Sequence, residues 1–102
     1  MELSEETTQY LPRILEIVRR ALEGTSCSIW LFGSRATGGA TTASDFDLAV
    51  SSEGDVSRAL SRAREELEES TIPFFVDLVE LGNASDALKS LVQRKEVLLW
   101  KS

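Results

Sequence analysis

Apolar residues recur at helical spacing in two long segments of the chain, and both segments are predicted to pack one face against a core. In residues 11–22 the apolar positions fall on one side of a helix, with arginine and glutamate on the other. Pro12 suits the first turn of this helix and Gly24 suits the position just past its end, although the helix begins earlier if Pro12 only bends it. A second helix follows Asp55, whose side chain can cap it. Its apolar stripe consists of Val56, Ala59, Leu60, Ala63 and Leu67.

Shorter apolar runs predict β-strands. They lie at residues 29–32, 46–50, 74–79 and 97–100. The first run ends at Gly33 and has no polar position, which is typical of a central strand buried on both faces. The last run is short and predicts an edge strand. Residues 34–44 are small and polar, which predicts a loop with room for one helical turn, and Asn83 can cap a short last helix.

The order of these elements predicts the fold class. Helix, strand, loop, strand, helix, strand, helix and strand follow one another without an internal repeat, which indicates an α/β (α+β) fold with a small mixed β-sheet of three to four strands flanked by helices. A length of 102 residues permits one modest core. We therefore expect a single domain over residues 1–102.

The composition narrows the chemistry that the chain can perform. Hydrophobic residues make up 42% and charged residues 27%, as in soluble globular proteins. The formal net charge of -6 argues against direct binding of nucleic acid through a broad basic face. The chain has no histidine, which removes histidine acid–base catalysis, Ser–His and Cys–His nucleophiles and most zinc sites. Any catalysis must therefore use carboxylates, hydroxyls, Lys, Arg or a metal held by oxygen.

The single cysteine and the N-terminal residues bear on the compartment. Cys27 is alone, so no intramolecular disulfide can form and a reducing setting fits. Residues 1–8 are acidic and polar, unlike a signal peptide, and no apolar run approaches the length of a membrane span. We expect a cytoplasmic protein without membrane contact.

Three aspartates are the candidate metal ligands. Asp45 and Asp47 leave the same face of a strand, with Cα atoms roughly 6.5 to 7 Å apart. Asp77 is flanked by apolar residues of a strand, where a buried carboxylate is costly unless it is paired or binds a cation. No Lys or Arg is near any of the three in sequence. A divalent cation is the natural counter-charge if they converge, and oxygen ligands suit Mg²⁺. Pairing of Asp77 with Arg13 or Arg19 is the structural alternative.

A candidate phosphate site precedes the aspartates. Gly33 ends a buried strand, so a phosphate can approach its backbone, and the Ser34 hydroxyl can donate a hydrogen bond to that phosphate. Arg35 supplies a positive charge beside the site. Each residue also has a plain structural interpretation: Ser34 as the cap of a helical turn, Arg35 as a structural ion pair, and the Asp45 and Asp47 pair as turn residues in water.

These residues together resemble a known superfamily. The segment 31–36 (LFGSRA), then 44–48 (SDFDL) ten residues after Ser34, then 76–78 (VDL), is similar to the polymerase-beta-like nucleotidyltransferases, and more narrowly to the minimal nucleotidyltransferase (MNT) domains. The resemblance covers nearly the whole chain and implies the nucleotidyltransferase fold. It implies that Asp45 and Asp47 hold one or two Mg²⁺ ions on a nucleoside triphosphate. Gly33 and Ser34 would hold its terminal phosphates, and Asp77 would bind a second metal and help to activate an acceptor hydroxyl.

The resemblance also implies a reaction and a partner. The reaction is transfer of a nucleoside monophosphate, AMP from ATP, to a hydroxyl of a partner macromolecule, with release of pyrophosphate. MNT proteins commonly act as antitoxins of a helical HEPN ribonuclease, and some adenylylate a tyrosine of that partner.

Two alternatives stay open. MNT sequences often have a second arginine where this chain has Thr37, so a binding module that neutralises its partner by contact alone is one alternative. A small-molecule nucleotidyltransferase of the aminoglycoside type is the other. The sequence also leaves open whether the chain forms a homo-oligomer.

Overall fold

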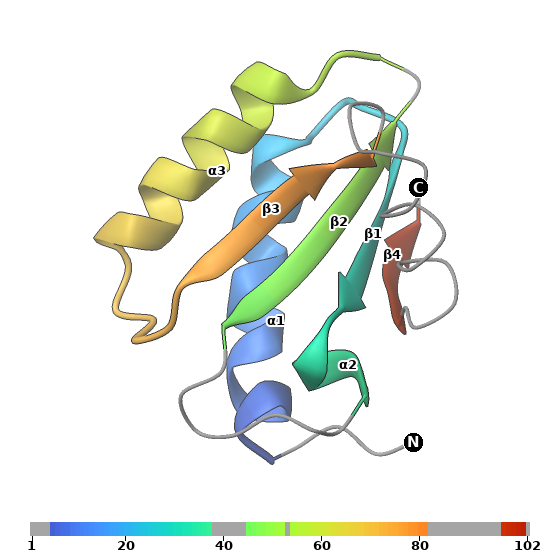
Figure 1. Ribbon diagram of the computed structural model, residues 1–102. Helices are drawn as coiled ribbons and strands as arrows, with labels where there is room; N and C mark the ends of the chain where they lie inside the picture. Colours follow the sequence, from blue (N-terminus) through green and yellow to red (C-terminus); the bar gives the residue numbers. More distant parts are fainter. Residues whose placement is uncertain (1–4, 38–44, 53, 82–96, 102) are drawn as a thin grey trace.

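A computed structural model describes residues 5–37, 45–52, 54–81 and 97–101. In chain order the elements are α1 (Glu5–Ala21), β1 (Cys27–Phe32), α2 (Ser34–Thr37), β2 (Phe46–Ser52), α3 (Ser57–Glu69), β3 (Val76–Glu80) and β4 (Val97–Lys101). The strands form one sheet in the order β3-β2-β1-β4 (Figure 1). β1 is antiparallel to β2 and to β4, whereas β2 and β3 are parallel. The sheet is therefore mixed and four-stranded, as predicted.

The two long helices explain which strand residues are buried. α1 packs against α3, and residues of both helices share one hydrophobic core with alternate residues of β1, β2 and β3. Members of this core with no exposed surface include Ile14, Val18, Ile29, Leu31, Phe46, Leu48 and Val50. The intervening strand residues face the other side of the sheet, where Ala49 and Leu81 form a small second cluster with Trp30 and Phe32. The side chains of β2 thus divide between a helix-covered face and the opposite face.

Several element boundaries differ from the sequence prediction. α1 begins at Glu5, so Pro12 lies inside the helix, which is the second of the two starts that the sequence allows. Glu5 and Glu6 in the first turn favour the earlier start because they complement the positive end of the helix dipole. β3 begins at Val76, two residues later than predicted. In β1 the second face is only half-buried, which corrects the prediction of a strand buried on both faces: among the described elements, α1 and α3 both cover the other face.

The remaining expectations concern the edge strand, the start of α3 and the last predicted helix. β4 lies at the edge of the sheet, as predicted. The N-cap residue of α3 is Val56, which makes no side-chain cap hydrogen bond, so the predicted cap by Asp55 is wrong by one residue. Asp55 lies just before it, and its Oδ1 accepts a hydrogen bond of 2.9 Å from the backbone N–H of Ser57, the first residue of α3. The short helix predicted after Asn83 lies outside the described residues. In the described ranges no helix has the length and apolar character needed to cross a membrane.

Candidate active site

The candidate site lies where β1 ends and β2 and β3 begin. The strand register pairs Asp47 of β2 with Phe32 of β1 on one side and with Asp77 of β3 on the other. Paired residues of neighbouring strands leave the same face of a sheet, and neighbouring strands are about 4.8 Å apart. Asp47 and Asp77 therefore lie side by side on the face opposite α1 and α3. Asp45 lies just before β2 and is exposed.

Asp47 is the electrostatic centre of this group. Its side chain is half-buried, and burial raises the pKa of its carboxyl above the ordinary value. The negative charges of Asp77 and Asp45 raise this pKa further, in that order. Both effects disfavour the ionised carboxylate. A cation bound between these side chains would relieve the repulsion and make ionisation of Asp47 favourable.

Gly33 joins the candidate phosphate loop to this carboxylate. It follows β1 directly and has a φ of 75°, a conformation that costs little for glycine alone. A Cβ atom at this position would lie 2.5 Å from Oδ2 of Asp47. The Asp47 carboxylate thus lies against the Gly33 backbone, and any other residue at position 33 would displace it.

The structure corrects the prediction for Asp77. The sequence pattern indicates a carboxylate inside a buried strand, but Asp77 is exposed. Its neighbours Val76 and Leu78 are buried on the helix face, and the alternation of a strand turns Asp77 to the opposite side. The proposed arginine partners are engaged elsewhere. Arg13 Nη2 donates to Thr71 Oγ1 at 2.7 Å, and the guanidinium of Arg19 lies 3.6 Å from the ring centroid of Trp100.

Arg35 adopts the structural alternative that the sequence left open. Its side chain has no exposed surface and forms an ion pair of 3.0 Å with Glu6. Its Nη1 donates a hydrogen bond of 3.0 Å to Thr7 Oγ1. Among the described residues, the guanidinium is therefore bound to the first turn of α1. Ser34 begins α2, and its side chain lies outside the described part, so its phosphate contact stays a prediction.

Sequence reasoning missed the residues around Arg35. Glu6 and Thr7 precede the segment that was predicted as helix, and nothing in their spacing indicates a partner almost thirty residues away. The aromatic residues Phe46 and Phe74 are visible in the sequence as strand residues, but their contact with a buried cation depends on the tertiary structure.

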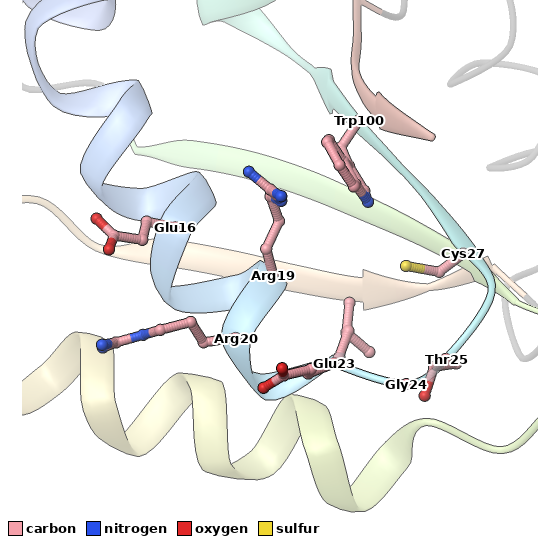
Figure 2. Close-up of a pocket in the computed structure, with 9 residues that line it drawn as sticks. Glu16, Arg19, Arg20, Glu23, Gly24, Thr25, Cys27 and Trp100 are labelled. Carbon is pink, nitrogen blue, oxygen red and sulfur yellow. The ribbon is translucent and has the colours of Figure 1, made fainter. Parts of the chain in front are cut away.

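Two hollows lie on the described surface. One, of about 540 Å³, is lined by residues that include Asp77, Phe75 and Arg64, and it gives access to one candidate carboxylate. The other, of about 560 Å³, lies beside the second half of α1, where Arg19 and Trp100 point toward each other (Figure 2). None of the three candidate aspartates lines this second hollow. Trp100 is half-buried against the core at the β4 edge.

The donor set of the three aspartates suits a hard divalent cation. No three His, Cys, Asp or Glu side chains within the described ranges form a ready-made metal cluster. Mg²⁺ does not require one, because it commonly binds through one or two carboxylates and completes its shell with water and substrate phosphate oxygens. Asp45, Asp47 and Asp77 offer oxygen ligands alone, and the pKa of Asp47 is raised first by burial and then by the negative charges of Asp77 and Asp45. We therefore regard the residues present as suited to a hard divalent cation.

Comparison with known proteins decides the family. Residues 25–102 match the model described as Polymerase beta, Nucleotidyltransferase. The chain belongs to this nucleotidyltransferase family. As an MNT domain it is 34% identical over 73 residues to the Haemophilus influenzae protein described as "Probable protein adenylyltransferase MntA". The match covers 71% of this chain and 64% of that protein, so the chain spans less than two thirds of this relative.

Solved structures share the fold of this MNT domain. One described as a minimal nucleotidyltransferase has a TM-score of 0.68 and 28% identity, with 92% of this chain and 94% of that chain covered. A toxin-antitoxin crystal structure with AMP-PNP gives a TM-score of 0.71 and 28% identity, with 88% and 73% covered. A tri-AMPylated Shewanella oneidensis HEPN toxin in complex with an MNT antitoxin gives 0.70 and 26%, with 94% and 73% covered. The predicted nucleotidyltransferase fold is thereby confirmed.

Proposed function

We propose that this MNT domain transfers AMP from ATP to a hydroxyl group of a HEPN-type partner protein and acts as the antitoxin of that partner. The observation that carries the proposal is the row formed by Gly33, Asp47 and Asp77: a backbone without a side chain, a carboxylate against it and a second carboxylate in register. Structural neighbours include a toxin-antitoxin structure with AMP-PNP and a tri-AMPylated HEPN toxin with an MNT antitoxin. These names support adenosine nucleotide as donor and a toxin as acceptor.

The residues of the row, together with Asp45 and Ser34, would each have a separate role in the reaction. Asp45 and Asp47 would hold the Mg²⁺ ions, with Asp77 as a further ligand. The bound ions would supply charge neutralisation for the triphosphate and for the leaving pyrophosphate. Gly33, having no side chain, lets the Asp47 carboxylate lie against its backbone, and Ser34 would donate to the terminal phosphates.

Asp77 would act on the acceptor. The acceptor oxygen bonds to the α-phosphorus of ATP, the bond from that phosphorus to the pyrophosphate oxygen breaks, and the hydroxyl proton passes to the Asp77 carboxylate. Asp77 is exposed and lines the hollow of about 540 Å³ beside β3, so a side chain of a partner can approach it. The exposed Phe75 in the same hollow offers an apolar contact to that side chain.

Labelling of a partner by the purified chain tests the proposal. The chain is incubated with Mg²⁺, α-labelled ATP and a HEPN-type toxin from the same genome, and the label on the toxin is followed. We expect labelling by the wild type and its loss in Asp47→Asn and Asp77→Asn. Asp55→Asn is the matched control, because it removes one carboxylate just before α3 and keeps a side-chain oxygen that can accept the hydrogen bond from the Ser57 backbone N–H.

Two results would contradict the proposal. Labelling that is equal in Asp47→Asn and the wild type would remove the carboxylate row from the mechanism. If the wild type and Asp77→Asn neutralise the toxin in cells equally well and no label is transferred, contact alone is sufficient.

A further inference from the structure

Arg35 is a buried cation that the proposed reaction does not use. It is the second residue of α2, directly after Ser34, and its side chain has no exposed surface. A buried charge without partners would be strongly destabilising. Arg35 has partners on two sides: Nη2 forms the 3.0 Å ion pair with Glu6 Oε1, and Nη1 donates to the fully buried Thr7 Oγ1. Both partners belong to the first turn of α1.

The face of the guanidinium contacts two aromatic rings. Its Cζ atom lies 4.0 Å from the ring centroid of Phe46 and 4.8 Å from that of Phe74. The two rings also pack edge to face, with centroids 5.6 Å apart, and Tyr10 of α1 contacts Phe74 in the same way at 5.2 Å. Such contacts are favourable for a desolvated arginine. Arg35 is thus the centre of a cluster that joins α1, α2, β2 and the segment before β3.

These ring contacts reach the backbone that carries the aspartates. Phe46 stands between Asp45 and Asp47, and its backbone N–H donates a 3.0 Å hydrogen bond to the carbonyl of Phe75, which ties the start of β2 to the start of β3. A shift of the Phe46 ring on the helix face would move the neighbouring carboxylates on the opposite face. Gly33, two residues before Arg35, lies against one of those carboxylates.

We propose that Arg35 is a positioning residue, which sets the Gly33 loop and the carboxylate row relative to α1, and that it does not bind nucleotide phosphate. The functional part of this inference rests on the proposed nucleotidyl transfer. The planar guanidinium suits the role because it donates to two acceptors along its edge and stacks on a ring with its face. A lysine ammonium cannot do both.

Binding of Mn²⁺ without nucleotide, measured by electron paramagnetic resonance, tests the positioning role directly. No phosphate is present, so an arginine that only binds phosphate would leave Mn²⁺ affinity unchanged on substitution. Loss of a positive charge by Arg35→Met would by electrostatics alone strengthen Mn²⁺ binding. We expect Arg35→Met, Arg35→Lys and Glu6→Ala each to weaken it about tenfold, because the ligands are misplaced. For Arg35→Met this is opposite to the electrostatic effect. Glu16→Ala, the same change at an exposed site of α1, should leave Mn²⁺ binding unchanged.

Steady-state pyrophosphate release adds a second readout. We expect kcat to fall about 10- to 100-fold in Arg35→Lys and in Glu6→Ala, and the double variant to be no worse than the poorer single variant, because both disrupt one contact. Leu60→Ala, in the core of α3, is a control that lowers stability and should keep wild-type kinetics well below its melting temperature.

The outcomes separate the two proposals. Two results would overturn the positioning role. One is wild-type Mn²⁺ affinity in both Arg35→Lys and Glu6→Ala. The other is a raised KM for ATP in Arg35→Lys together with unchanged kinetics in Glu6→Ala. An equal loss of kcat in Leu60→Ala would show that Arg35 serves stability alone. A wild-type chain that binds Mn²⁺ but transfers no AMP would refute the proposed function, and the Mn²⁺ series would still decide the role of Arg35.

Discussion

Substitution of Gly33 by alanine tests the link between the loop and the carboxylate row. At a φ of 75°, an L-residue costs about 1–2 kcal/mol relative to glycine. The new Cβ would in addition lie 2.5 Å from Asp47 Oδ2, roughly 1 Å inside ordinary contact. Overpacking of this kind costs about 1–3 kcal/mol. Gly33→Ala should therefore lower the free energy of unfolding by about 2–5 kcal/mol and displace the Asp47 carboxylate.

The chain contains a matched control for this experiment. Gly24 has a φ of 85°, but a Cβ at this position would meet no atom within 4 Å beyond its chain neighbours, so Gly24→Ala has the backbone strain without the collision. Urea unfolding should show a loss of about 1–2 kcal/mol for Gly24→Ala and a larger one for Gly33→Ala. Mn²⁺ affinity should fall in Gly33→Ala alone. Equal losses of stability together with equal Mn²⁺ affinity in both variants would refute the contact between Gly33 and Asp47.

Further predictions concern charge. Burial and the neighbouring aspartates raise the pKa of Asp47, so the native state loses stability as pH rises through that pKa and the carboxyl ionises. Without metal at pH 7, Asp47→Asn should therefore unfold at a higher urea concentration than the wild type. This difference should shrink on acidification, because the wild-type carboxyl becomes protonated. An Asp47→Asn variant that is less stable than the wild type at pH 7 without metal would contradict the pKa argument. Mn²⁺ at 100 times its Kd should stabilise the wild type by about 2.7 kcal/mol and leave Asp47→Asn almost unchanged. Arg35→Ala should lose about 3 kcal/mol, because it removes a fully buried guanidinium from the half-buried Glu6 and the buried Thr7. Arg20→Ala, which breaks the exposed pair with Glu66, should lose less than about 1 kcal/mol in the same urea titration.

The fold was largely predictable because its signals are local. The apolar stripe of α3, the apolar run of β1 and the short run at residues 97–100 each indicate an element that the structure contains. The start of α1 was not predictable in the same way. Pro12 is a strong local signal for a helix start, but burial of Thr7 and its hydrogen bond to Arg35 keep the preceding turn helical. Such tertiary contacts outweigh a local preference of a few kcal/mol.

The sequence identifies the candidate carboxylates but mispredicts the burial of Asp77. The sequence places Asp77 in a strand and the structure agrees, but the supposed burial of its carboxylate depended on which side of β3 faces the helices. A strand at the edge of the described sheet, with helices on one face, leaves every second side chain exposed. Spacing alone could not distinguish these faces.

By itself the sequence determined the family pattern, the helix and strand order and the three aspartates, because periodicity and motif spacing are properties of the chain. Tertiary structure alone decided that Asp47 and Asp77 stand in register, that Gly33 lies against Asp47 and that Arg35 is buried against Glu6 and Thr7. The physical reason is that strand pairing and burial bring together residues that are far apart in the sequence, from Gly33 and Asp47 to Asp47 and Asp77. The surroundings of a charged side chain, and therefore the role proposed for Arg35, depend on these tertiary contacts and not on its neighbours in the sequence.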